Sequence, residues 1–311
     1  MHNKSKSLAH LVIALATATP MLLSALAADT LNAQILGEAG LVMPAQTQAL
    51  EYDHLAALRN LPNYAALKQQ FAGAALDNAQ RAAADLGIQE GEVDEIVLGS
   101  TPEDLYILFA GKFSGSVTAN NALRRNISRV EVDGTTMLCP RAGNCVLFLE
   151  DSVAAFGTGK QVITMLEARE GIRPRLQSNR DFVDFVLATD RGAPVRGAAF
   201  GTQLKNVIGS AFSGTAANSM SWASYSTFID RFSYSVRFDT KAQVTARVQC
   251  KAEIQAALLR QMLGALAGVE SLAVKTGHDQ VNRPFQNLRL ALSGRTVELQ
   301  MDAPIPNSER P

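Results

Sequence analysis

Paired runs of alternating residues, joined by short polar turns, are the feature of this sequence that most restricts its fold. Residues 232–238 alternate between apolar and polar side chains, residues 244–248 do the same, and Asp239-Thr240-Lys241 joins the two runs. A period of two is typical of a strand with one buried face. Two such runs on either side of a tight turn predict a β-hairpin, and therefore antiparallel pairing.

The same arrangement recurs along the chain, with helical patterns between the paired runs. Further strands are expected at 47–52, 93–98, 105–113, 130–138, 146–156, 194–200, 288–290 and 296–301. Helical patterns are expected at 62–87, 119–125, 158–171, 178–189, 203–212 and 253–269. Runs of adjacent strands separated by helices favour antiparallel sheets with helices packed on one face, which is an α+β arrangement.

The strand and helix pattern occurs twice, so we expect a first α+β domain at 45–190 and a second at 191–303. Each unit has enough paired strands and helices to close a sheet of its own. In the second unit, helix 253–269 is expected to bury the face formed by Leu258, Met262 and Leu266.

The succession "LYILFAGKF", "ISRVEVDGTTML", "CVLFLEDSVAAFGTGKQVITMLEA" and "FSYSVRFDTKAQVTARVQCKAEIQAALLRQMLGAL" resembles a bacterial extracytoplasmic domain family of unknown function. The likeness spans most of residues 45–302. It implies two tandem ferredoxin-like halves. The family has no established catalytic residues, so the resemblance implies none here.

The first 27 residues are typical of a secretory signal peptide. Lys4 and Lys6 precede a largely apolar stretch, and Ala25-Leu26-Ala27 provides a small-x-small cleavage site. We therefore predict cleavage after Ala27 and a periplasmic or extracellular location. A retained anchor is the alternative, although Pro20 weakens it. Residues 28–44 are expected to form a flexible mature N-terminus, and the Pro-rich residues 304–311 a disordered tail.

Three cysteines remain after the signal: Cys139, Cys145 and Cys250. Cys139 and Cys145 flank a loop of Pro, Gly and Asn between two strand patterns, so a hairpin places them opposite each other. We predict that they form a disulfide, because an exported chain meets an oxidising compartment. A metal site is disfavoured, since no second Cys or His pair lies nearby. Cys250 is expected to be a free, buried thiol.

Charge and motifs give no sign of nucleic-acid, nucleotide or metal binding. The 29 Lys and Arg residues balance the 29 Asp and Glu residues, whereas phosphate binding needs a basic surplus. Gly159-Lys160 suggests a phosphate loop, but Ala154 stands where the first Gly belongs and Gln161 where Ser or Thr belongs. Thr158 and Gln161 instead predict a capping box at a helix start. No cofactor is expected.

Candidate catalytic residues are few once the signal is removed. His54 and His278 are the remaining histidines, and the sequence has no G-x-S-x-G or H-E-x-x-H motif. Carboxylates cluster at Glu92-Asp94-Glu95, Glu103-Asp104 and Glu150-Asp151. A pair of carboxylates can perform acid/base hydrolysis across a cleft. A hydrolase using His278 or a carboxylate pair is therefore the alternative function.

The favoured interpretation is an exported, non-enzymatic binding or structural component of the cell envelope. Trp222 and Tyr225 lie among Ser and Thr residues at 213–227, a composition that suits a contact loop, although a plain linker fits it equally. The partner would be a protein or another envelope component. Contact with the membrane is expected only if the signal segment is retained.

Overall fold

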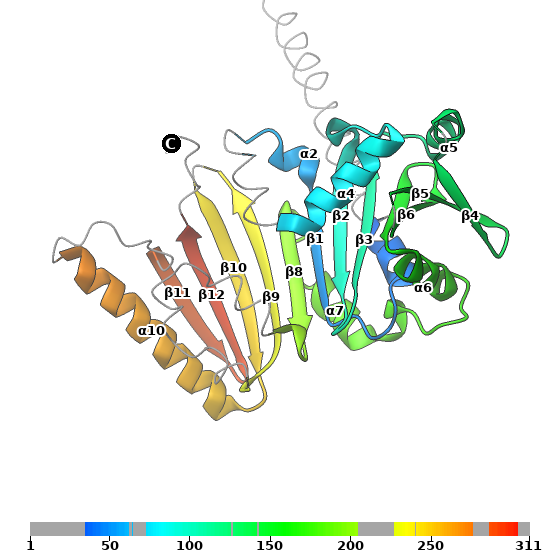
Figure 1. Cartoon of the computed structure of the whole chain (residues 1–311). Coiled ribbons are helices and arrows are strands. Elements are labelled where there is room, and N and C mark those ends of the chain that lie inside the picture. The colour runs from blue at the N-terminus through cyan, green and yellow to red at the C-terminus, as the bar shows by residue number, and fades with distance from the viewer. Residues whose placement is uncertain are drawn as a thin grey trace, which may run out of the picture.

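A single antiparallel sheet of twelve strands forms the framework of the protein (Figure 1). The structure is a computed structural model, and it describes residues 35–61, 64, 73–125, 127–141, 143–204, 227–239, 241–275 and 286–303. From one edge to the other the strands follow the order β11-β12-β10-β9-β8-β1-β2-β3-β7-β6-β5-β4. The predicted α+β class with antiparallel strands is therefore confirmed.

The strands are β1 (Ala49–Asp53), β2 (Val93–Ser100), β3 (Leu105–Gly111), β4 (Ser128–Val132), β5 (Thr135–Arg141), β6 (Asn144–Glu150), β7 (Val153–Gly157), β8 (Val195–Phe200), β9 (Ile229–Phe238), β10 (Ala242–Cys250), β11 (Gln286–Ser293) and β12 (Thr296–Ala303). The helices are α2 (Leu55–Leu58), α4 (Gly73–Leu86), α5 (Gly115–Arg124), α6 (Gly159–Arg169), α7 (Arg180–Leu187) and α10 (Glu253–Lys275). Two 3₁₀ turns, η1 (Glu90–Glu92) and η2 (Leu176–Ser178), complete the named elements. Thr158 and Gln161 form the predicted capping box at the start of α6.

The two predicted units share this sheet. Strand β8, which begins the unit at 191–303, pairs with β1 of the unit at 45–190, and Ala49 lies opposite Ala199. Without β8, the N–H and C=O groups on one side of β1 would form an exposed edge. The pairing of β1 with β8 therefore joins what the sequence suggested as two sheets.

The sheet divides into two parts that differ in how helices cover them. We call β1–β7 the covered half and β9–β12 the open half, with β8 between them. In the covered half, α2 and α4 pack on one face and α6 and α7 on the other. The expectation of helices on one face is thus wrong for this half. The largely apolar β3 explains it, since five of its seven residues are buried and need cover on both sides.

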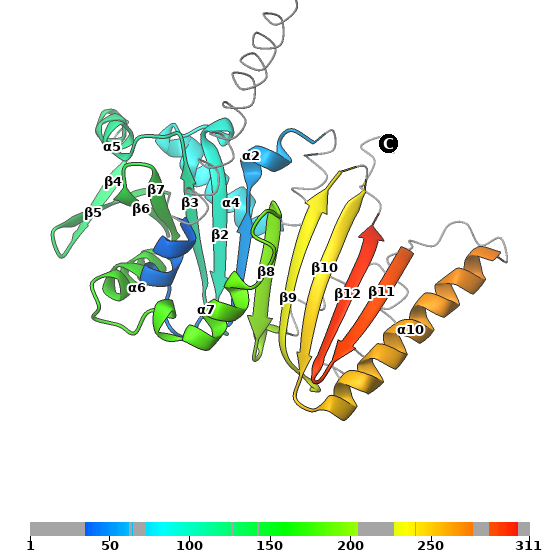
Figure 2. The same ribbon diagram turned by 180° about the vertical axis from the view of Figure 1, so that it is seen from behind.

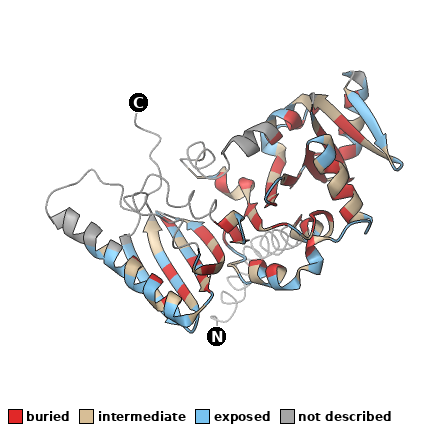
Figure 3. Cartoon of the chain, turned by 60° about the horizontal axis from the view of Figure 1, so that its bottom comes forward, coloured by how far each residue is buried: buried red, intermediate tan, exposed pale blue. Residues whose placement is uncertain are grey.

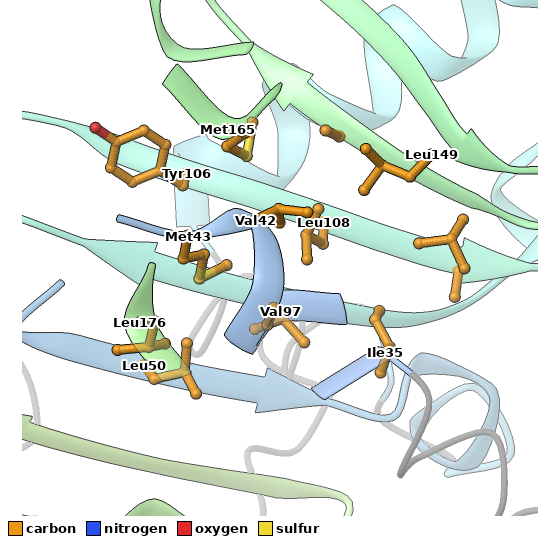
Figure 4. Close-up of a cluster of buried hydrophobic side chains, with 14 of the residues drawn as sticks. Ile35, Val42, Met43, Leu50, Val97, Tyr106, Leu108, Leu149, Met165 and Leu176 are labelled. Carbon is orange, nitrogen blue, oxygen red and sulfur yellow. The ribbon is translucent and has the colours of Figure 1, made fainter. Parts of the chain in front are cut away.

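Residues 35–42 form a helix and belong to the core of the covered half. Ile35, Val42 and Met43 are completely buried, and they pack with Leu50 and Leu108 (Figure 4). The expectation of a flexible N-terminus at 28–44 is therefore wrong from residue 35 onward. Ile35, Ala39, Val42 and Met43 recur at helical spacing, so one face of this segment is apolar.

In the open half, α10 packs on the same face as α2 and α4. It buries Ala256, Leu259 and Leu263 against strands β10 and β12. Leu258 is 49% exposed, so its expected burial is wrong. Figure 3 shows exposed residues along much of the described part of this helix. The helix is rich in apolar residues on several sides, and the sequence therefore did not determine which side faces the sheet. The side chain of Leu266 lies outside the described part of the chain.

Candidate functional site

The opposite face of β10, β12 and β11 is a polar, exposed surface, whereas Ser233 and Ser235 on the same face of β9 are buried. Figure 2 shows this side, where none of the described helices lies over β10, β12 or β11. The strands alternate strictly here, so every second residue points away from α10. The exposed side chains on this face are Gln243, Thr245, Arg247, Glu298, Gln300, Arg289, Ala291 and Ser293. We call these residues the open face.

Cross-strand register brings the polar side chains of the open face into rows. Thr245 lies opposite Gln300, and Arg247 lies opposite Glu298. Arg289 continues the first of these rows on the edge strand, because it pairs with Gln300. Side chains directly opposite each other are close enough to interact or to contact one ligand together. The open face therefore offers amide, hydroxyl and charged groups in a regular array.

Most charges on and around the open face are paired. The nearest nitrogen of Arg247 lies 2.9 Å from Glu298, and Lys241 lies 3.5 Å from Asp302. Such exposed pairs contribute only about 0–1 kcal/mol each. Their main effect is that the surface is polar without a large excess of either charge.

A second unusual feature lies at the centre of the sheet, where β1 carries three consecutive polar residues. Glu51 and Asp53 point to the α2 side, and Tyr52 points to the α7 side. Asp53 is only 2% exposed, and both of its carboxyl oxygens lack a hydrogen-bond partner within the described residues. Buried polar groups almost always have partners. The three residues therefore form an exceptional strand, which we call the polar strand segment.

Glu51 is held by a tyrosine from two strands away. The Tyr234 hydroxyl on β9 donates a hydrogen bond to Glu51 Oε2. Gly197 on β8 lies between them in register, opposite both residues. A Cβ atom at Gly197 would lie 2.7 Å from the Tyr234 ring and 2.9 Å from the Leu50 carbonyl oxygen. Only glycine therefore allows the ring to lie across β8 and reach the carboxylate.

On the opposite face, Tyr52 contacts both a buried carboxyl group and a buried guanidinium group. Its hydroxyl donates a 2.8 Å hydrogen bond to Glu95 Oε1, and the Arg196 guanidinium lies 4.7 Å from the centre of its ring. Glu95 and Arg196 are 3% and 4% exposed, so both are removed from water. This cation–π contact gains strength from burial.

Burial controls the pKa values of this segment. Desolvation raises the pKa of Glu51 to about 6, although the Tyr234 hydrogen bond opposes the rise. Desolvation and the neighbouring Glu51 charge raise the pKa of Asp53 well above its usual value. The pKa of Glu95 is also raised by desolvation. Glu51, Asp53 and Glu95 therefore bind protons more tightly than carboxyl groups in water do.

The predicted disulfide is confirmed, and it joins Cys139 on β5 to Cys145 on β6. Cys250 is free and completely buried, and desolvation raises the pKa of its thiol. A thiol of this kind is a poor nucleophile. The described residues contain no group of three or more His, Cys, Asp or Glu side chains that could hold a metal ion.

Comparisons with known proteins identify no family. No family model and no curated protein matches the chain. Among solved structures, crystal form III of TP0453 has a TM-score of 0.49 at 10% sequence identity, covering 85% of this chain and 92% of that chain. Crystal form I of TP0453 has a TM-score of 0.49 at 11% identity, covering 85% and 91%. Among the described helices, none has the length and apolar character needed to cross a membrane.

The acidic clusters suggested by the sequence have structural partners. Asp94 forms a 2.7 Å ion pair with Arg59, and Asp104 accepts a hydrogen bond from Gln161. Asp151 accepts hydrogen bonds from Ser114 and Ser116 at the start of α5, which lower its pKa. Glu92 takes part in the capping box of η1, and Glu95 is the buried partner of Tyr52. Glu103 and Glu150 are exposed.

Several predicted residues lie outside the described part of the chain. These are Ala27, Trp222, Tyr225 and His278. His54 is described: it precedes α2, and burial lowers its pKa. The polar strand segment was not anticipated from the sequence. The one available signal was Glu51-Tyr52-Asp53 at the end of the strand expected at 47–52, because three polar residues in succession place polar side chains on both faces of a strand.

Proposed function

We propose that this chain is an exported, non-enzymatic binding component of the cell envelope, and that it contacts its partner through the open face. The disulfide supports the compartment, because disulfides persist in oxidising environments such as the periplasm or the cell exterior. The signal pattern at residues 1–27 supports export. The proposed partner is a polar envelope component.

The observation that carries this proposal is the regular array of polar groups on an uncovered sheet face. Gln243 and Gln300 each offer an amide donor and acceptor, and Thr245 offers a hydroxyl. The array is flat and is built on paired strands, so its groups are held in place before a partner arrives. Preorganised polar groups bind with a smaller entropic cost than flexible ones.

Binding can be tested by co-sedimentation of the mature protein with isolated envelopes that contain membranes and cell wall. The variant Thr245→Ala/Gln300→Ala removes two neighbouring groups from the open face. We expect it to lower the affinity roughly tenfold, since each hydrogen bond contributes about 0.5–1.5 kcal/mol. The control, Ser128→Ala/Arg129→Ala on β4, changes exposed residues at the other edge of the sheet. If both variants bind the envelopes equally well, the open face is not the binding surface.

Export is tested separately by fractionation and by the mass of the mature chain. A chain beginning at residue 28 in the exported fraction is the expected result. A chain that retains residues 1–27 in the membrane fraction would replace this proposal with the anchored alternative. A chain found in the cytoplasm would contradict both.

The hydrolase alternative has its own test in His278→Ala. If the protein acts by binding, this variant should retain its cellular role at matched protein level, because no nucleophile depends on that imidazole. Loss of the role in a folded His278→Ala protein would favour the hydrolase.

A further inference from the structure

The polar strand segment lies where the two halves of the sheet meet. Strand β1 pairs with β2 of the covered half on one side and with β8 on the other, and β9 of the open half follows β8. Glu51 and Asp53 are two residues apart on one strand, so their side chains share a face and lie about 7 Å apart at Cα. Two acidic side chains therefore lie close together at the centre of the sheet, where Asp53 is buried and Glu51 is partly buried.

We propose that Glu51 and Asp53 form a proton-sensitive junction between the covered half and the open half. With protons bound, both carboxyls are neutral, and β1 stays paired with β8. When the protons are lost, two like charges are confined in a buried site, and the pairing of β1 with β8 loosens. This inference concerns the stability of the junction and does not depend on the proposed binding function.

The surroundings of the two carboxyls offer little to compensate their charge. From β2, the same face presents Ile96 and Leu98, which are apolar, and from β8 it presents Val195 and Gly197. Strand β9 contributes the Tyr234 hydroxyl, which donates to Glu51 and leaves Asp53 without a donor among the described residues. An uncompensated buried carboxylate is unstable relative to its protonated form.

Other charged groups nearby are engaged elsewhere. At the end of β1, Arg59 of the α2 C-terminus forms an ion pair with Asp94, which also lies 3.7 Å from Lys112. His54 has its pKa lowered by burial and is therefore largely neutral at pH 7. On the opposite face of β1, Arg196 lies over the Tyr52 ring, and Glu95 accepts the Tyr52 hydrogen bond. Among the described residues no group is left to pair with Asp53 except a bound proton.

The sign of the effect follows from the raised pKa values. A carboxyl whose pKa is higher in the folded chain stabilises the fold at low pH, and this contribution is lost as the pH rises through the folded value. For Glu51 the pKa rises from 4.5 to about 6, so its contribution to stability is lost as the pH rises between these two values. This alone corresponds to about a 30-fold fall in the folding equilibrium constant, since each pKa unit is a factor of ten. Asp53 acts in the same direction.

The test uses the unmodified mature chain first, with amide hydrogen exchange measured between pH 4.5 and pH 8. We expect the protection factors of the β1–β8 amides to fall at least 30-fold across this range, while those of the β6–β7 amides change less. Protection in β1 and β8 that is constant or rises with pH would overturn the proposal. This measurement needs no variant, so a folding failure cannot obscure it.

Asp53→Asn and Glu51→Gln then imitate the protonated groups. Each variant should keep higher β1–β8 protection than the unmodified chain at pH 8 and should show a weaker dependence on pH. The matched control is Asp151→Asn, because Asp151 is exposed and its pKa is lowered. It should leave the pH dependence above pH 4.5 unchanged. If both junction variants lose protection with pH as steeply as the unmodified chain, the two carboxyls are not the sensor.

Discussion

Strands β3 and β10 show how differently the two halves of one sheet are constructed. In β3, five consecutive residues from Tyr106 to Ala110 are buried, and helices lie over both faces. In β10, buried and exposed residues alternate along most of the strand, and among the described helices only α10 packs on it. The period of the apolar residues therefore indicates the number of covering layers: a continuous run needs two, and alternation needs one.

The largest expected effect on stability comes from substitutions in β3, which helices cover on both faces. Leu108 and Phe109 are neighbours on opposite faces, and both are almost completely buried. Leu108→Ala should cost about 2–5 kcal/mol and Phe109→Ala about 3–5 kcal/mol in the free energy of unfolding, because each leaves a cavity. Urea denaturation measures both values.

The matched pair on β10 is Val248, which is buried, and Arg247, which is exposed. Val248→Ala should destabilise the protein clearly, whereas Arg247→Ala should stay within about 0.5–1 kcal/mol. A large effect at both β10 positions would show that the open face is covered after all.

The next effect concerns how α10 covers the open half. Leu263 is 2% exposed and packs in the core, whereas Leu258 on the same helix is 49% exposed. Leu263→Ala should cost about 2–5 kcal/mol, and Leu258→Ala should stay within about 0.5 kcal/mol. Thermal and urea unfolding of the two variants provide the comparison. If Leu258→Ala is the more damaging change, α10 has been assigned the wrong face.

The smallest effect concerns the far end of the covered half, where the disulfide links β5 to β6. Only six positions separate Cys139 from Cys145, so the cross-link closes a short loop. In the chain-entropy account it contributes about 2 kcal/mol. Cys139→Ser/Cys145→Ser should lower stability by that amount. Thiol titration of the denatured oxidised chain should find one free thiol, that of Cys250; three free thiols would contradict the disulfide.

The sequence predicted those features whose causes are local. Turn residues between Cys139 and Cys145 placed the two cysteines opposite each other, and the Thr158 and Gln161 side chains marked the start of α6. The alternation in β9 and β10 identified both strands, and in β10 it also identified the buried side; in β9, Ser233 and Ser235 on the polar side are buried as well. Each of these inferences used only residues that are close together in the sequence.

What the sequence did not predict depends on partners far away in the chain. The sequence of the 191–303 unit gave no sign that β8 would pair with β1. Strand pairing is made by backbone N–H and C=O groups, which are the same whatever the side chains are. Glu51 and Asp53 were not recognised, since acidic residues are rarely buried. The exposed side of α10 was assigned wrongly at Leu258, because a helix that is apolar on several sides has no unique buried stripe.

The position of β1 in the sheet also bears on how quickly the chain can fold. Ala49 pairs with Ala199, 150 positions later, so the centre of the sheet cannot close until β8 has been synthesised. At roughly 5–20 residues per second, synthesis of that stretch takes about 8–30 seconds. Pairings between such distant segments also form slowly after synthesis, because a long loop must be closed first. During that interval the chain lacks its central pairing, and the N–H and C=O groups on one side of β1 have no partner from β8.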